Sequence, residues 1–332
     1  MAEKLYADVT GIANPIAINL STGHSYSTAT ANVHCKTASI GIGDQMIIDM
    51  GYETNHAKVF QGYVKSITRE IPDDTYKIVA KDDLIRAVDF FVVPTNPEDS
   101  FKRTNIDAED LVEQVLALAG LTNFTFTPTS FTFATRDETE VEVKLTSAYD
   151  FCKMIADLLT WHLYSDEDGL IHFINRKPHV MDGTSGQPGD IADVAINLGN
   201  PITDSTILNF TYNESDRDLR NRVVVHGSEG VYAEALASSP YLPAGFYKSM
   251  ALVSPIIDDD GMAQNAANYN LQLYNKLTVA SSMVVIGDPT YLARRVIEIN
   301  EAITNTTGDW YIYLAEHNWS KEGYVVNMEL RI

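Results

Sequence analysis

The chain has few cysteines and no long apolar run. Its only cysteines among 332 residues are Cys35 and Cys152, which stand at no metal-ligand spacing. Two isolated thiols predict inert core residues in a reducing, cytosolic setting, not a disulfide framework or a metal site. No eighteen apolar residues follow one another, so no membrane-spanning helix is expected. The N-terminus, MAEKLYADVTG, lacks the apolar segment of a signal peptide.

Positive charge is also scarce. The chain has 24 Lys and Arg against 45 Asp and Glu, for a net charge of −21. Such a chain repels phosphate, so specific nucleic-acid binding is not expected. Two interpretations of the acidic balance stay open. It serves solubility alone, or acidic surface lines a passage that DNA crosses without adhering.

Catalytic motifs are missing as well. The sequence has no glycine-rich phosphate loop, no Gly-x-Ser-x-Gly elbow and no Cys/His nucleophile arrangement. Its carboxylates are too numerous for any pair to be singled out as the acid and base of a glycosidase. We therefore expect a protein that is not an enzyme, with no catalytic, cofactor-binding or metal-binding residues and no cofactor.

A few residues could still form a site. The acidic runs Asp166 to Gly169 and Asp258 to Gly261 lack the alternating ligands and distal Glu of a calcium loop, which favours turn or cap chemistry. His162 and His172 could pair across a hairpin as structural residues, but they have no third metal ligand. The remaining candidates are expected to be core or interface aromatics, with a sugar platform as the alternative: Trp161, Trp310 and Trp319.

Residues 43–82 carry the clearest strand pattern. Short alternating runs are separated by turn residues at Gly43-Asp44, Gly51-Tyr52 and Pro72-Asp73-Asp74, which is typical of half-buried antiparallel strands. The pair Asp82-Asp83 is expected to be solvated at a turn. A weaker echo of the pattern occupies the last third of the chain: Asn221 to Gly227, Val285 to Pro289, Trp310 to Leu314, and Tyr324 to Ile332.

The middle of the chain has helical periodicity. Residues 107–120 show apolar residues at helical spacing between a capping Asp107 and Gly120. A second helix is expected to start at Ser147, and Asp168-Gly169 predicts the turn of a β-hairpin.

These patterns predict a mainly β fold with an α+β insert, in which two tandem small antiparallel β-barrel modules flank a mixed α/β region. The expected domains are a first barrel over residues 1–95, an α+β domain over 96–205, and a second barrel over 206–332 with a helical insertion near 258–276. Strand edges of such modules can be hidden by ring assembly. Three copies of a chain with two modules would present six similar units.

The order and spacing of these motifs resemble the phage baseplate hub proteins, that is, the late control protein D family and its relatives in contractile tails and secretion devices. The resemblance rests on Gly43-Asp44, on Val59 to Val64, and on Val79 to Asp82 for the first barrel. For the second barrel it rests on Asn221 to Gly227 and on Glu316 to Tyr324. Gly287-Asp288-Pro289 departs from the pattern, because the usual Pro-Gly pair does not follow it.

The resemblance implies a homotrimeric hub that forms a pseudo-sixfold ring, joins the tail tube to the central spike and encloses the DNA channel. Implied partners are the tail tube or distal tail protein, the central spike protein and baseplate wedge proteins, with the tape measure protein as a further one. DNA would pass without specific binding, and no membrane would be contacted. The location would be the tail baseplate of a virion, assembled in the host cytoplasm. One alternative is a β-rich receptor- or carbohydrate-binding tail protein, and a glycan hydrolase is another.

Overall fold

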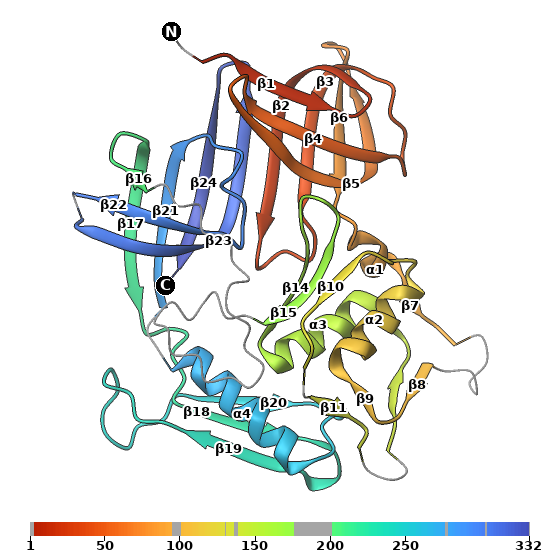
Figure 1. Ribbon diagram of the computed structural model, residues 1–332, viewed down its shortest axis with the longest axis vertical. Helices are drawn as coiled ribbons and strands as arrows, with labels where there is room; N and C mark the ends of the chain where they lie inside the picture. The colour runs from red at the N-terminus through yellow and green to blue at the C-terminus, as the bar shows by residue number, and fades with distance from the viewer. Residues whose placement is uncertain are drawn as a thin grey trace.

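A computed structural model gives the fold and describes residues 3–94, 101–129, 131–135, 139–175, 201–275, 278–302 and 304–331. Strands dominate and form two six-stranded modules, with helices and short sheets beside them (Figure 1). The expected fold class, mainly β with an α+β region between two barrel modules, is confirmed.

The first barrel closes on itself. Its strand order is β1-β4-β5-β6-β3-β2, and Val9 of β1 pairs with Ile12 of β2 to complete the circle. Alternating apolar residues point inward, so Ile18, Val33 and Ile48 are all buried. The strands are β1 (Leu5–Val9), β2 (Ile12–Gly23), β3 (Thr30–Ala38), β4 (Gln45–Tyr52), β5 (Asn55–Glu70) and β6 (Thr75–Lys81).

The second barrel repeats this order. Its strands run β16-β22-β23-β24-β21-β17, and a turn in which Thr206 N bonds Thr203 O leads from β16 to β17. Trp310 and Ile312 of β23 fill its core. The strands are β16 (Ile202–Thr203), β17 (Ile207–Ser215), β21 (Thr278–Ile286), β22 (Val296–Glu301), β23 (Thr306–Ser320) and β24 (Gly323–Arg331).

Two β-bulges lie at matching places in the repeat. The pairing of β2 with β3 shifts between Pro15 and Ala17, and that of β17 with β21 shifts between Ile207 and Asn209. Each shift inserts one extra residue near the start of the first strand of the pair. Because β-bulges are conserved features of a fold, this shared position identifies β17 as the equivalent of β2.

A second pair of matching bulges shows which strands correspond in the other half of each barrel. The pairing of β5 with β6 shifts between Val64 and Ser66, and that of β23 with β24 shifts between Ile312 and Leu314. Strand β23 is therefore the equivalent of β5. The repeated strand order and the two repeated bulges indicate that the two barrels share one structural plan. They differ at one strand, because β16 pairs parallel with β22 whereas β1 pairs antiparallel with β4.

The middle domain packs helices against short sheets. Ser147 caps its longer helix, since Ser147 Oγ accepts a hydrogen bond from Asp150 N at 3.0 Å, as the sequence predicts. Gly120, with φ of 76°, follows the other predicted helix. The helices are α1 (Ile85–Asp89), α2 (Ala108–Leu118) and α3 (Ala148–Leu159).

Four sets of short strands complete this domain. They are β7 (Phe91–Val92) with β13 (Thr146–Ser147), β8 (Phe101–Arg103) with β12 (Val141–Val143), β9 (Ile106–Asp107) with β11 (Thr132–Phe133), and the hairpin β14 (Trp161–Ser165) and β15 (Ile171–Asn175) with β10 (Phe124–Phe126) beside it. The hairpin turns at Asp168-Gly169, as predicted.

Residues 216–275 differ from the expected division of the chain. The segment from Asn221 to Gly227 was expected in the second barrel, but β18 (Arg222–His226) pairs with β19 (Tyr232–Leu236) and β20 (Ser249–Val253) in a separate sheet. Helix α4 (Asp260–Tyr274), predicted near 258–276, covers this sheet, and a 3₁₀ turn spans Ser228–Gly230. The buried apolar residues of this sheet and of α4 belong to the same core as those of α2 and α3, because they face the middle domain and not the second barrel.

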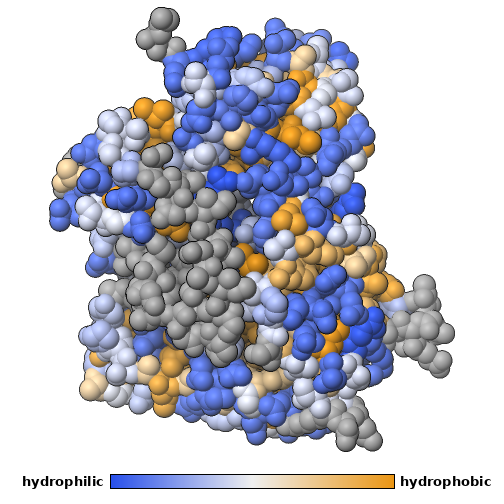
Figure 2. All heavy atoms as spheres, in the orientation of Figure 1, coloured by the Kyte–Doolittle hydropathy of each residue, from blue (hydrophilic) through white to orange (hydrophobic). Residues whose placement is uncertain are grey.

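Burial thus divides the molecule into two cores. One fills both barrels, and the other joins the middle domain to the sheet of β18, β19 and β20. The face of the first barrel seen in Figure 2 is mainly hydrophilic, as expected for inward-pointing apolar residues. None of the described helices is long and apolar enough to cross a membrane.

Candidate functional site at the junction of the two barrels

A continuous ladder joins the two barrels. Residues Ala17–Gly23 of β2 pair antiparallel with Leu314–Ser320 of β23, so both barrels share one twelve-stranded sheet. Asn19 Nδ2 donates to Asn318 Oδ1 across the seam at 2.6 Å. Leu20 is fully buried beside this seam, so the two barrels are joined through a hydrogen-bonded and packed contact.

The turn of the β14–β15 hairpin is shaped by Asp166. Its Oδ1 accepts from the backbone N–H groups of Asp168 and Leu170, both at 2.9 Å. Its Oδ2 lies 2.7 Å from His172 Nε2. Burial alone would raise the pKa of Asp166, but the His172 contact and the two N–H donors hold that pKa below its ordinary value. The predicted turn chemistry of the run Asp166 to Gly169 is confirmed.

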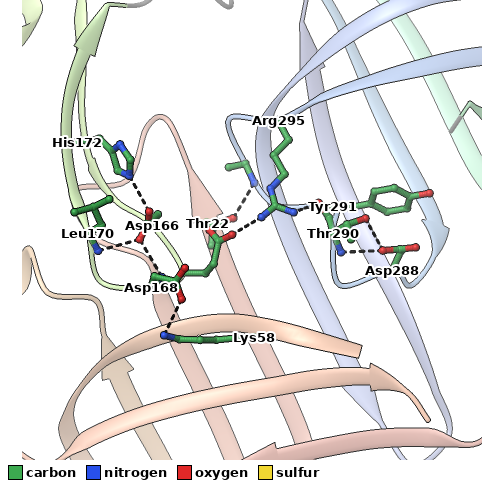
Figure 3. A network of polar contacts seen from close by, with 12 residues as sticks. Thr22, Lys58, Asp166, Asp168, Leu170, His172, Asp288, Thr290, Tyr291 and Arg295 are labelled. Carbon is green, nitrogen blue, oxygen red and sulfur yellow. Dashed lines mark hydrogen bonds and ion pairs between the residues drawn. The ribbon is translucent and has the colours of Figure 1, made fainter. Parts of the chain in front are cut away.

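The same turn binds both barrels (Figure 3). Glu167 forms an ion pair with Arg295 of the second barrel, and both side chains are largely shielded from solvent. Asp168 Oδ1 lies 3.0 Å from Lys58 Nζ of the first barrel. Through these two ion pairs the hairpin turn connects the middle domain to both barrels.

A partly buried cation lies behind this turn. The Arg294 guanidinium lies 4.2 Å from the centre of the Tyr164 ring, and its Nη2 donates to Gly23 O at 2.8 Å. Burial raises the pKa of Tyr164 to about 12, so the phenol stays neutral. Arg294 thus connects the second barrel with the hairpin and with the end of β2.

Asp82 faces Arg294 from the first barrel. Asp82 and Asp83 were expected to be solvated, but this prediction is wrong for both, because Asp82 is only 4% exposed and Asp83 only 9%. Its carboxylate accepts from Ala29 N at 2.6 Å and Leu84 N at 3.1 Å. Burial raises the pKa of Asp82 to about 7, although these donors and Arg294 oppose the rise.

A small cavity of about 40 Å³ remains between these groups. Its walls include Asp82, Arg294 and Tyr164. A perturbed carboxylate in a cleft can mark a catalytic site. Here the cavity has room for only a few water molecules, so the arrangement suits holding the domains together and not binding a substrate.

Arg294 takes the place that glycine has in the first barrel. Gly43 N donates to Val64 O at 2.9 Å, and Arg294 N donates to Ile312 O at 2.8 Å. Since Val64 and Ile312 flank equivalent bulges, Arg294-Arg295 is the counterpart of Gly43-Asp44. Gly287-Asp288-Pro289, which departs from the family pattern in the sequence, leads into a turn in which Thr290 N donates to Asp288 Oδ1 at 2.8 Å.

One family matches nearly the whole chain, over residues 24–331, and it is described as YQBQ-like. The chain belongs to the YQBQ-like family. This is a phage tail family, which agrees with the resemblance to phage baseplate hub proteins noted in the sequence. No curated protein matches the chain by sequence.

Solved structures show which fold the YQBQ-like chain has. The prophage MuSo2 43 kDa tail protein from Shewanella oneidensis superposes with a TM-score of 0.65 at 13% identity, over 99% of this chain and 96% of its own. The tail protein from Neisseria meningitidis MC58 gives 0.66 at 9% identity, over 100% and 96%. The E. coli c3393 protein gives 0.57 at 8% identity, over 98% and 76%. It is described as a component of the type VI secretion system that is structurally similar to T4 bacteriophage tail proteins gp27 and gp5.

The other sequence candidates in this YQBQ-like chain lie apart. His162 and His172 do not pair, because His172 lies opposite Tyr164 and stacks on it at 4.7 Å, whereas His162 lies opposite Ile174. Asp259 caps α4, where its Oδ1 accepts from Gly261 N at 2.7 Å, which confirms the cap chemistry expected there. No cluster of three or more His, Cys, Asp or Glu side chains among the described residues could hold a metal ion.

The thiols and indoles have the expected core positions. Cys35 and Cys152 are buried, and burial raises the pKa of each thiol. All three tryptophans are buried too, which removes the sugar-platform alternative: Trp161, Trp310 and Trp319. Arg294 belongs to no sequence motif, so its role at the junction was not predicted. Asp82 was singled out as a turn residue and as the end of the motif Val79 to Asp82, but its burial was not predicted.

Proposed function

We propose that this YQBQ-like chain is the structural hub of a phage-type baseplate. Three copies would form a homotrimer whose six barrels make a pseudo-sixfold ring around the DNA channel. One observation carries the proposal: the two barrels repeat the same strand order and share two matching bulges, and they are joined through β2 and β23. A threefold assembly of such chains has six nearly equivalent units.

The repeat supports a role as symmetry adaptor. A ring of six similar barrels can meet a sixfold partner on one side, for which we propose the tail tube or the distal tail protein. The middle domains occur only three times per ring and suit a threefold partner, for which we propose the central spike. Baseplate wedge proteins and the tape measure protein are further proposed partners. We place the protein in the tail baseplate of the virion, assembled in the host cytoplasm.

The acidic balance supports a channel. With a net charge of −21, the ring would repel the phosphates of DNA, so ejected DNA would pass its wall without adhering. The proposal includes no specific nucleic-acid binding. It requires carboxylates to face the lumen, so a neutral or basic inner wall in a map of the assembled ring would contradict it.

We also propose that the protein is not an enzyme. The perturbed carboxylate Asp82 already serves the junction, and the cavity beside it is too small for a substrate. The carbohydrate-binding alternative has no specific observation in its favour, because the tryptophans that suggested it are buried.

Light scattering on the purified chain, coupled to gel filtration over a wide concentration range, tests the proposal. The expected mass is that of three chains, with a population that grows with concentration by mass action. A mass of one chain at every concentration, and also in the presence of the tail tube and spike proteins, would contradict the trimeric hub.

A further inference from the structure

The seam between the two barrels is one half of a repeating pattern. On one edge of β23, partner β22 ends its pairing at Tyr311, and β2 takes over that edge from Leu314 to Ser320. The seam therefore needs two parts: the edge of β2, and the second half of β23 beyond β22. By the repeat, the equivalent parts are β17 and the second half of β5.

The second half of β5 has an open edge. Strand β4 pairs with β5 from Asn55 to Tyr63, and Val64 is held by the turn at residues 43–44. Beyond it, residues 66–70 pair only with β6 within the described part of the chain. This edge corresponds to the one that receives β2 in the second barrel, and it presents unpaired backbone groups to solvent.

Strand β17 has an open edge too. Among the described residues it pairs only with β21, whereas its equivalent β2 pairs on both sides. Ile18 and Leu20 of β2 are fully buried, but Tyr212, the equivalent of Leu20, is 42% exposed. The difference arises because β2 has a neighbouring barrel beside it, whereas β17 has none within the described residues.

We propose that β17 of one copy pairs antiparallel with residues 66–70 of β5 in the next copy. This inference rests on the proposed trimer and names its interface. The repeat also sets the register. In the seam, Leu20 lies opposite His317, and their equivalents are Tyr212 and Arg69. Ser21 lies opposite Glu316, and their equivalents are Asn213 and Thr68. The proposed pairing therefore places Tyr212 opposite Arg69 and Asn213 opposite Thr68.

The chemistry of the two edges fits this register. Arg69 lies directly across from Tyr212, where a guanidinium can lie on the ring. Glu214 of β17 is then the diagonal neighbour of Arg69, so opposite charges face each other along the pair of strands. Because the two edges differ, the contact is head-to-tail, which is the kind of interface that closes into a ring.

The two edges also lie on different sides of the molecule. Strand β17 runs along the left margin in Figure 1, and β5 and β6 lie at the upper right. One copy can therefore offer its β17 to one neighbour and its β5 to another at the same time. Three such contacts, alternating with the three internal seams, complete a ring of six barrels.

Cysteine cross-linking tests the register in the full-length chain. His24 N donates to Tyr313 O, so His24–Tyr313 is a hydrogen-bonded pair. Hydrogen-bonded and non-hydrogen-bonded pairs alternate along the strands, which makes Ser21–Glu316, three pairs further on, a non-hydrogen-bonded pair. Asn213 and Thr68, at the equivalent positions, are exposed, and their Cβ atoms would be about 5 Å apart, within reach of a disulfide. The double variant Asn213→Cys with Thr68→Cys should, after mild oxidation, run as a three-chain band that reducing agent returns to one chain.

Controls separate the possible outcomes. Asn213→Cys with Thr37→Cys places the second thiol at an exposed position of β3, away from the β5 edge, and this variant should stay at one chain. Light scattering is run on each variant to record assembly independently. If the chain is trimeric but the 213–68 pair does not cross-link, the proposed pairing is overturned while the hub proposal stands. Dimers from Asn213→Cys alone would indicate a symmetric contact and also overturn it. A single-chain mass throughout would sink both proposals.

Discussion

Gly43 and Arg294 occupy the same position of the repeated barrel, with φ of 87° and 70°. Glycine adopts this left-handed conformation freely, whereas arginine adopts it at a cost of about 1 to 3 kcal/mol. The second barrel tolerates that cost because the Arg294 side chain reaches Gly23, Tyr164 and the neighbourhood of Asp82. The same turn position therefore holds a glycine in the first barrel and an interdomain contact residue in the second.

Replacing Arg294 should separate these two effects. Arg294→Ala keeps the strained backbone and removes the cation, so we expect the free energy of unfolding to fall by about 2 kcal/mol. Arg294→Gly removes the cation and relieves the strain, so it should be less destabilising by about 1 kcal/mol. Urea unfolding of both variants measures the difference. Equal losses would show that the backbone at this position is not strained.

The buried carboxyl of Asp82 should make stability depend on pH. Its pKa is about 7 in the folded protein and near 3.8 when unfolded. Between these two pH values the folded state binds one more proton than the unfolded state. The resulting contribution to the free energy of unfolding is fully present below pH 4 and is lost as the pH rises to 7. Within that window the slope approaches about 1.4 kcal/mol per pH unit.

Asp82→Asn tests this dependence, since the amide does not titrate. Asparagine can accept through one oxygen only, so the variant should be less stable than wild type at pH 4 to 5. The gap should narrow toward pH 8. Unfolding curves measured at several pH values give the comparison, and parallel pH profiles of variant and wild type would rule the effect out.

The two ion pairs of the hairpin turn should differ in strength. Glu167→Gln leaves the shielded Arg295 without its partner, and we expect a loss of about 1 to 3 kcal/mol. Asp168→Asn removes a pair whose carboxylate is 72% exposed, so the loss should stay below about 1 kcal/mol and vanish at high salt. Denaturant titrations at low and high salt measure both losses, and a salt-sensitive Glu167 effect would contradict this ranking.

The glycine in the motif Phe60-Gln61-Gly62 has a steric reason. A Cβ on Gly62 would lie 2.2 Å from Lys81 O and 2.7 Å from the Phe60 ring. Gly62→Ala should therefore destabilise the first barrel by about 3 kcal/mol or more. Gly323 is also at ordinary φ with open space around its Cα, so Gly323→Ala should change stability by less than about 1 kcal/mol. Thermal unfolding of the two variants gives the contrast, and similar melting temperatures would exclude the steric explanation.

Local signals made much of the fold predictable. Ser147, Gly120 and Asp168-Gly169 mark helix ends and a turn, and each acts within a few residues, so their effects can be read from the sequence. The strand pattern of residues 43–82 is equally local. It led to the correct fold class.

The junction could not be predicted in this way. Asp82 looks like a solvated turn residue, and only the arrival of the hairpin and of Arg294 buries it. The sequence similarity between the two barrels is weak because the large aromatic residue stands at different positions of equivalent strands. Gly62 of β5 is equivalent to Trp310 of β23, and Phe60 is equivalent to Gly308. Each barrel fills its core from a different position, so the sequences diverge while the backbone is kept.

The pairing of β2 with β23 also imposes an order of events during synthesis. Asn19 and Asn318, which are bonded in the fold, lie 299 residues apart. A ribosome adding about 5 to 20 residues per second makes the first about 15 to 60 s before the second. Throughout that interval the edge of β2 lacks its partner and is open to pairing with other nascent chains. The shared sheet is therefore finished only as the last strands leave the ribosome.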